Sequence, residues 1–136
     1  MTWPFSMTDT EIYQAELTLS PFITSALSGL ESEDIHTEGR VRRLAECYVY
    51  GAVRYLASYD DMRPANTGAL LKSMICSHFD ADSDEVTECL RFCAEVRDGE
   101  REKLFMMEGA GALRRWLVNN DKTVANDLKD LMASSN

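Results

Sequence analysis

Residues 38–59, which read EGRVRRLAECYVYGAVRYLASY, decide the fold that we predict for this chain. Apolar residues recur along this stretch at intervals of three and four, which is the spacing of an α-helix. The main face carries Val41, Leu44, Ala45, Tyr48, Ala52, Tyr55, Leu56 and Tyr59, and Val49 and Val53 lie off it. Because more than half of the circumference is apolar, we predict a central helix surrounded by other helices. It must end before Pro64, since the residue before a proline avoids the helical conformation.

The rest of the chain also shows helical spacing, and no stretch alternates with the period of two that marks a strand. One helix is expected from a capping box of Thr8 and Glu11, and Pro21 either kinks it or begins a second helix capped by Ser20. Further helices are expected over about residues 67–78, 83–97, 100–117 and 122–133, the last with Asn120 or Asp121 as its cap. Residues 1–136 are therefore predicted to form a single all-α domain, an orthogonal bundle of five to seven helices.

The helix predicted over about residues 100–117 is expected to be mostly buried and to lie at the centre with the helix of residues 38–59. Its apolar side chains point in almost every direction, and the only polar stripe consists of Arg101, Glu108 and Arg115. Gly109 and Gly111 lie in its middle, where residues without a bulky side chain would let the backbone of a neighbouring helix approach closely.

The composition excludes several classes of protein. The chain has 136 residues, of which 45% are apolar, and a formal net charge of −9 from 23 acidic and 14 basic residues. The apolar fraction is too high for a disordered chain, and no apolar run reaches the roughly 18 residues that a membrane span needs. The acidic balance argues against nucleic-acid binding, which relies on clustered Lys and Arg.

The N-terminus and the cysteines indicate a cytoplasmic protein. The first residues lack the basic and apolar regions of a signal peptide. Cys89 and Cys93 are four positions apart and share one apolar helix face, so we expect small hydrophobic side chains in a reducing compartment. A zinc site is not expected, because His36 and His78 lie at no ligand spacing from the cysteines.

No motif in the sequence supports catalysis or a cofactor. Residues 80–84 resemble the start of a calcium-binding loop, but Glu85 and Arg91 occupy the positions that require Gly and Glu. The segment 109–112 lacks the Lys and the preceding strand of a phosphate-binding loop. Glu108 is the one candidate for an acid or base with a raised pKa, and a solvated stripe with its neighbouring arginines is the simpler interpretation. We therefore expect a protein that is not an enzyme and binds no metal or cofactor.

The acidic residues are concentrated in two blocks. The net charge is −7 over residues 1–39, +3 over 40–79, −6 over 80–102 and +1 over 103–136. The basic block contains Arg40, Arg42 and Arg43 at the start of a helix, where cations oppose the helix dipole, so local pairing with the acidic blocks is one explanation. Solvated surface is the default interpretation of any such run of charges.

The functional interpretation is that the acidic blocks dock a basic protein, since an acidic patch steers a basic partner and raises its association rate. The candidate docking residues are Glu31, Glu33, Asp34, Asp80, Asp82, Asp84 and Glu88, with Phe79 as an apolar anchor beside the second block. Trp3, Phe5 and Tyr13 are candidate anchors in the first block, and core packing is the alternative for each aromatic residue.

Small acidic helical chains with stretches of this kind are typical of a known group of proteins. The stretches are YVYGAVRYL at residues 48–56 and MMEGAG at residues 106–111. The chain resembles the immunity proteins of bacterial polymorphic-toxin and type VI secretion systems. The resemblance implies that it binds one cognate toxin in the cytoplasm and covers the active site of that toxin, and the acidic blocks lead us to expect a basic toxin.

The alternative function is a homo-oligomeric regulatory or adaptor module. The helix of residues 38–59 would supply the interface, and Tyr50 and Val53, which lie off its main face, would suit it. A homodimer is the simplest form of that alternative. Neither function involves nucleic acid or a membrane.

Overall fold

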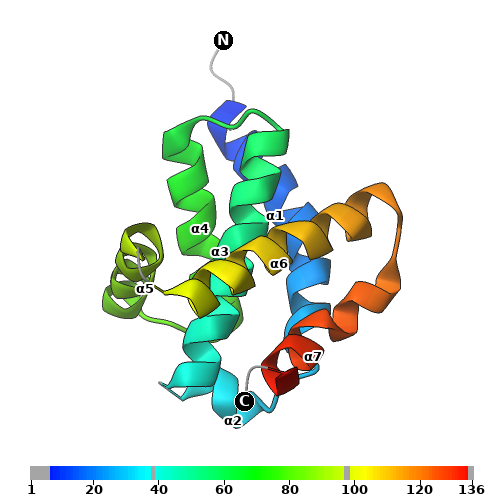
Figure 1. The fold of residues 1–136 in the computed structure, drawn as a ribbon. Coiled ribbons are helices and arrows are strands. Elements are labelled where there is room, and N and C mark those ends of the chain that lie inside the picture. The colour runs from blue at the N-terminus through cyan, green and yellow to red at the C-terminus, as the bar shows by residue number, and fades with distance from the viewer. Residues whose placement is uncertain (1–6, 38, 97–98, 135–136) are drawn as a thin grey trace.

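The computed structural model describes residues 7–37, 39–96 and 99–134, and the fold of these residues is entirely helical (Figure 1). The elements are α1 (Met7–Leu27), α2 (Ser32–His36), α3 (Arg40–Tyr59), α4 (Pro64–Phe79), α5 (Ser83–Glu95), α6 (Glu100–Val118), the 3₁₀-helix η1 (Lys122–Asn126) and α7 (Asp127–Ser134). With seven α-helices and no strand in this part of the chain, the all-α prediction is confirmed.

The centre of the molecule is the crossing of α6 over α3 (Figure 1). Each helix contributes a glycine to this crossing. A Cβ atom added to Gly51 would lie 2.6 Å from the carbonyl carbon of Met106, and one added to Gly109 would lie 2.8 Å from the carbonyl carbon of Tyr48. Since the glycine hydrogens face the backbone of the opposite helix, the two predictions of a central pair of helices and of a close approach at Gly109 are confirmed.

An aromatic cluster joins α1 to both central helices. The ring of Phe22 stacks on Tyr48 with centroids 6.2 Å apart and meets Trp116 edge-on at 5.7 Å. These offset and edge-to-face geometries are the favoured arrangements of aromatic pairs. Tyr48 is fully buried, and its hydroxyl has no hydrogen-bond partner within the described residues.

The first and the last helix differ from their predictions. Residues Met7–Leu27 form one helix with Pro21 inside it, so no second helix begins at Ser20. Thr8 lies within the first turn rather than at the N-cap, because the helix begins two residues earlier than expected. The last predicted helix is divided into η1 and α7, and its expected cap is present: Asp121 accepts a hydrogen bond from the backbone nitrogen of Thr123 at 3.0 Å.

The expectation that residues 100–117 are mostly buried is wrong. Only Phe105, Gly109, Ala112 and Leu113 of α6 are buried. Leu104 and Met107 are 41% and 70% exposed, and a Cβ atom added to Gly111 would meet nothing within 4 Å. The physical reason is that α6 packs on α3 through one face, while no described element covers the other face (Figure 1).

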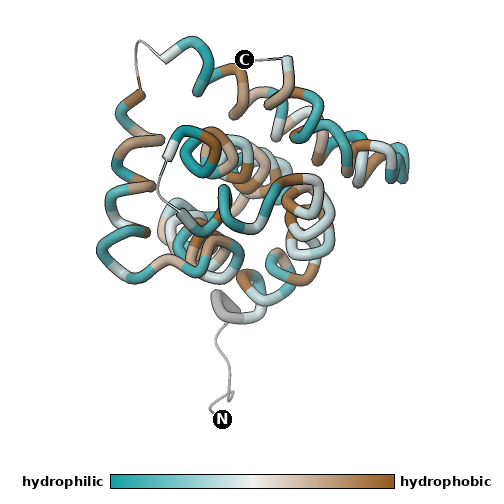
Figure 2. Tube along the Cα trace, turned by 90° about the horizontal axis from the view of Figure 1, so that it is seen from below, coloured by the Kyte–Doolittle hydropathy of each residue, from teal (hydrophilic) through white to brown (hydrophobic). Residues whose placement is uncertain are grey.

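No helix within the described ranges combines the length and the apolar character that crossing a membrane requires. The buried apolar residues form one cluster, to which every helix contributes at least one described side chain. The helix α5 lies at the edge of the bundle, and hydrophilic and hydrophobic positions alternate along it (Figure 2). Its exposed side and the short helix α2 carry the acidic residues that the sequence analysis selected.

Candidate functional site

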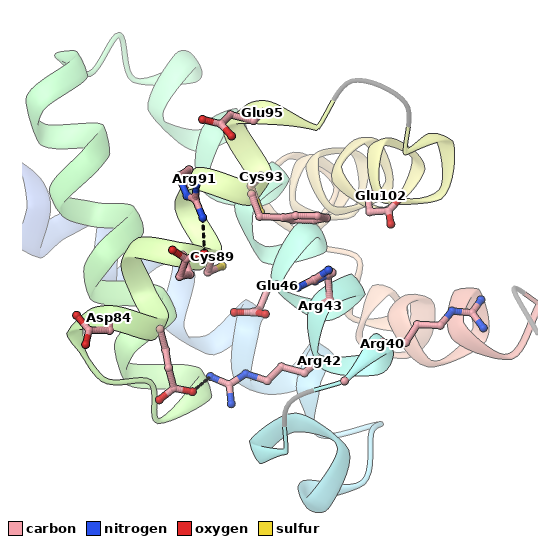
Figure 3. Close-up of a pocket in the computed structure, with 14 residues that line it drawn as sticks. Arg40, Arg42, Arg43, Glu46, Asp84, Cys89, Arg91, Cys93, Glu95 and Glu102 are labelled. Carbon is pink, nitrogen blue, oxygen red and sulfur yellow. Dashed lines mark hydrogen bonds and ion pairs between the residues drawn. The ribbon is translucent and has the colours of Figure 1, made fainter.

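The two acidic segments meet at Arg42, the third residue of α3. The side chain of Arg42 is only 6% exposed. Its Nη1 donates a hydrogen bond to the backbone oxygen of His36, the last residue of α2, at 3.5 Å. Its Nη2 lies 3.2 Å from Oε2 of Glu85 in the first turn of α5 (Figure 3). One guanidinium group therefore bridges two segments that are far apart in the sequence.

The structure leaves every acidic docking candidate exposed and places these residues on the two segments that Arg42 joins. We call this set, with Glu85 added, the acidic surface: Glu31, Glu33, Asp34, Asp80, Asp82, Asp84, Glu85 and Glu88. The sequence analysis did not select Glu85 or Arg42. The position of Arg42 near the start of a helix, against the direction of the helix dipole, was the only sign in the sequence that it needs a partner.

Part of the acidic surface has local structural roles. Asp82 is the N-cap of α5 and forms a capping box with Glu85: Asp82 Oδ1 accepts from the Glu85 backbone nitrogen at 2.9 Å, and Glu85 Oε1 accepts from the Asp82 nitrogen at 3.2 Å. Glu88 pairs with Arg91 at 2.6 Å. The expected pairing of the basic block with an acidic block is therefore confirmed for Arg42 and Glu85.

Five carboxylates of the acidic surface have no such role. They form no side-chain hydrogen bond and no ion pair with any described residue, and they are Glu31, Glu33, Asp34, Asp80 and Asp84. Because they are exposed and unpaired, these carboxylates keep their full charge available to an incoming partner.

The expectation that Phe79 anchors a partner is wrong. Phe79 is the last residue of α4 and is 0% exposed, because the end of α4 packs into the core. Tyr13 is well exposed on α1 and remains available as an anchor, whereas Trp3 and Phe5 lie outside the described residues.

A groove of about 800 Å³ lies beside the acidic surface, between the start of α3, the length of α5 and the start of α6. It is lined mostly by charged side chains of both signs: Arg40, Arg42, Arg43, Glu46, Asp84, Glu85, Glu88, Arg91, Glu95 and Glu102. Three of its arginines contact other groove residues: Arg42 pairs with Glu85, Arg91 pairs with Glu88, and the Arg43 guanidinium lies 4.3 Å from the centroid of the Phe92 ring.

Glu46 is the half-buried carboxyl in this groove, and its side chain lies between Arg42 and Arg43 (Figure 3). Burial raises the pKa of Glu46 above its ordinary value. A hydrogen bond with the Cys89 thiol and the charges of the two arginines oppose this increase without cancelling it.

The Cys93 thiol, which lines the groove, is a poor nucleophile. Cys47, Cys89 and Cys93 are buried, as expected of small hydrophobic residues, whereas Cys76 is exposed. Hydrogen bonds with Cys47 and Cys89, together with burial, raise the pKa of the Cys93 thiol above its usual range. Since the thiolate is the reactive form, this environment opposes nucleophilic chemistry. Among the described residues, no three His, Cys, Asp or Glu side chains are arranged to hold a metal ion.

Glu108 lies on the exposed side of α6, where a solvated stripe would place it. Arg115, one of the two arginines in the predicted stripe, forms an ion pair with Asp127 and not with Glu108.

Comparisons of the chain with protein families, with curated proteins and with solved structures found no match. Its function therefore has to be argued from the acidic surface and the groove.

Proposed function

We propose that this chain is a cytoplasmic inhibitor protein of the immunity type, which binds a basic toxin through the acidic surface and covers the active site of that toxin. In this proposal the chain is a binding protein and not an enzyme. The observation that supports it is the presence of five unpaired, exposed carboxylates on two segments that one buried arginine joins.

The physical basis is electrostatic steering. The chain has a net charge of −9, and the acidic surface lies where the two most acidic blocks of the sequence meet. A surface of one charge attracts a partner of the opposite charge over a Debye length of about 10 Å at 0.1 M salt. Such attraction raises association rates by about 10- to 1000-fold and confers selectivity for oppositely charged partners.

The test begins with a candidate toxin, the product of the gene adjacent to the one for this chain. It is produced with and without this chain in a bacterial host, and rescue of growth supports inhibition. The association rate of the purified pair is then measured between 50 and 500 mM salt for two variants. One carries E31Q, E33Q and D34N on α2, and the other carries D80N and D84N, which leaves the Asp82 cap intact.

The matched control carries D60N and D61N. These two acidic residues are equally exposed but follow the C-terminal end of α3, while the acidic surface lies at its other end. We expect each acidic-surface variant to bind several-fold more slowly and the control to bind as the parent does, with stability changed by less than about 0.5 kcal/mol. If all three variants bind like the parent at every salt concentration, the acidic surface serves solubility and the proposal is wrong.

The alternative, a homo-oligomeric adaptor, needs a different interface from the one expected. Tyr50 and Val53 are buried within the chain, so these two residues are not available to a second copy. The homo-oligomeric alternative is supported by the exposed apolar residues of α6, since exposed apolar patches mark interaction sites. A concentration-dependent dimer seen by sedimentation, and weakened by Met107→Asp, would favour the adaptor over the inhibitor.

A further inference from the structure

The exposed side of α6 carries apolar residues that no described element covers (Figure 1). Of the seven large apolar side chains that are exposed in the described part of the chain, four lie on this helix. Leu104 and Met107 lie seven and four positions before Gly111, and Val118 lies seven positions after it. Residues at these intervals share one side of an α-helix, so they form a continuous exposed face.

Two opposite charges flank this face at equal distances from Gly111. Glu108 lies three positions before the glycine and Arg114 lies three positions after it, and both are exposed. Neither side chain forms a hydrogen bond or an ion pair with any described residue, so both charges are available to a partner. We call this set the α6 face: Leu104, Met107, Glu108, Gly111, Arg114 and Val118.

A second copy of the chain matches both the apolar and the charged residues of the α6 face. In a two-fold dimer the same patch serves both copies, so it must be complementary to itself. When two α6 helices cross antiparallel at Gly111, Leu104 of one copy meets Val118 of the other, because each lies seven positions from the crossing. Glu108 of each copy then lies beside Arg114 of the other. A parallel pairing would bring like charges together, so the charges select the antiparallel arrangement.

Gly111 allows the two helices to approach closely where they cross. A Cβ atom added to Gly111 would meet nothing within 4 Å, whereas one added to Gly109 would meet the backbone of Tyr48. The helix α6 therefore has one glycine in its crossing with α3 and another on its open side. A contact limited to one helix face is small beside the roughly 1,600 Å² of a standard protein interface, so the dimer is expected to be weak.

We infer that the chain forms a weak two-fold dimer through antiparallel contact of two α6 faces, centred on Gly111, with Glu108 of each copy paired with Arg114 of the other. This inference goes beyond the proposed function and does not rest on it, since the α6 face and the acidic surface share no residue. By itself such a dimer favours the homo-oligomeric alternative. A dimer that also binds the toxin combines both roles.

The test follows the dimer by sedimentation equilibrium at low salt, at protein concentrations from about 1 to 300 μM. Glu108→Arg and Arg114→Glu each place like charges beside one another across the interface, so each should weaken the dimer at least about tenfold. Val118→Asp should weaken it as well. The matched control is Leu17→Asp, which changes a similarly exposed apolar residue of α1 and should leave the dimer as in the parent. Circular dichroism and urea unfolding check that each protein is folded.

The decisive measurement mixes the Glu108→Arg and Arg114→Glu proteins. In an antiparallel dimer of the two variants, the introduced arginine lies beside the introduced glutamate, and the remaining Arg114 lies beside the remaining Glu108. We therefore expect a heterodimer, identified by native mass spectrometry, whose dissociation constant is within about threefold of that of the parent.

Three results would overturn the inference: a parent that stays monomeric over the whole range, a dimer that the α6 variants weaken no more than Leu17→Asp does, or a mixture no tighter than the separate variants. The toxin measurements give an independent answer. If the α6 variants lose the dimer but bind the toxin normally, while the acidic-surface variants also bind it normally, the dimer stands and the proposed function is wrong. If the parent is monomeric but the acidic-surface variants bind the toxin more slowly, the proposed function stands and the dimer is wrong.

Discussion

Replacing Gly109 by Ala tests the close crossing of α3 and α6. The added Cβ atom would lie 2.8 Å from the carbonyl carbon of Tyr48 and closer still to its oxygen, whereas ordinary contacts begin at 3.4 Å. The helices must therefore separate by at least 0.6 Å to clear the carbon, and by more to clear the oxygen. Neither atom is the end of a flexible side chain, so only a backbone movement relieves the contact.

The magnitude follows from two opposing effects. Overpacking a close-packed interior costs about 1–3 kcal/mol, and a rigid backbone obstacle places Gly109→Ala near the upper end of that range. The higher helix propensity of Ala returns about 1 kcal/mol. We expect a net loss of about 2 kcal/mol in the free energy of unfolding.

Gly111→Ala is the matched control, two positions away on the same helix. Its Cβ atom would meet nothing within 4 Å, so only the helix propensity changes, and we expect a gain of about 0.5–1 kcal/mol. Both variants are measured by urea unfolding followed at the far-ultraviolet helical signal, and comparable slopes ensure that the midpoints report stability. If Gly109→Ala is as stable as Gly111→Ala, the two backbones do not meet at Gly109.

Three further changes test single side chains by urea unfolding. Glu46→Gln should stabilise the fold at pH 7, because the pKa of Glu46 is raised by burial and its charged form destabilises the folded state. The gain in stability of Glu46→Gln over the parent should shrink as the pH falls through that raised pKa, since Glu46 then becomes protonated in the folded protein. A gain that does not change with pH would contradict the raised pKa of Glu46. Tyr48→Phe should leave stability unchanged or raise it by about 1 kcal/mol, since the buried hydroxyl has no partner, whereas a clear loss would reveal one. Asp82→Ala should cost about 1 kcal/mol through loss of the capping box, and a neutral result would show that the cap does not stabilise α5.

The sequence was informative about α3 because its apolar residues cover most of the helix circumference. Such a helix has only one stable environment, which is the centre of the molecule. The same reasoning failed for α6, where Leu104 and Met107 made the pattern look equally apolar although α6 is covered on one side only. Periodicity counts the apolar residues of a helix but does not reveal how many neighbouring helices are available to cover them.

Apart from Glu85, the residues of the acidic surface were predictable one by one, because carboxylates are exposed in almost any fold. Its arrangement was not predictable. Arg42 and Glu85 are 43 positions apart, and their contact depends on how α2, α3 and α5 are packed. Phe79 shows the converse error: it directly precedes the acidic segment in the sequence, yet its side chain is buried in the core at the end of α4.

The crossing of α3 and α6 also has a kinetic consequence. Gly51 and Gly109 are 58 positions apart, so the chain must close a long loop before either glycine meets the opposite backbone. Contacts of such sequence separation slow folding, whereas helix formation itself is local and fast. The helices α4 and α5, which lie in this loop and pack on each other, can form first and shorten the distance that remains to be closed. Joining α3 to α6 is then the step that sets the folding rate, so Gly109→Ala should act by slowing folding more than by accelerating unfolding.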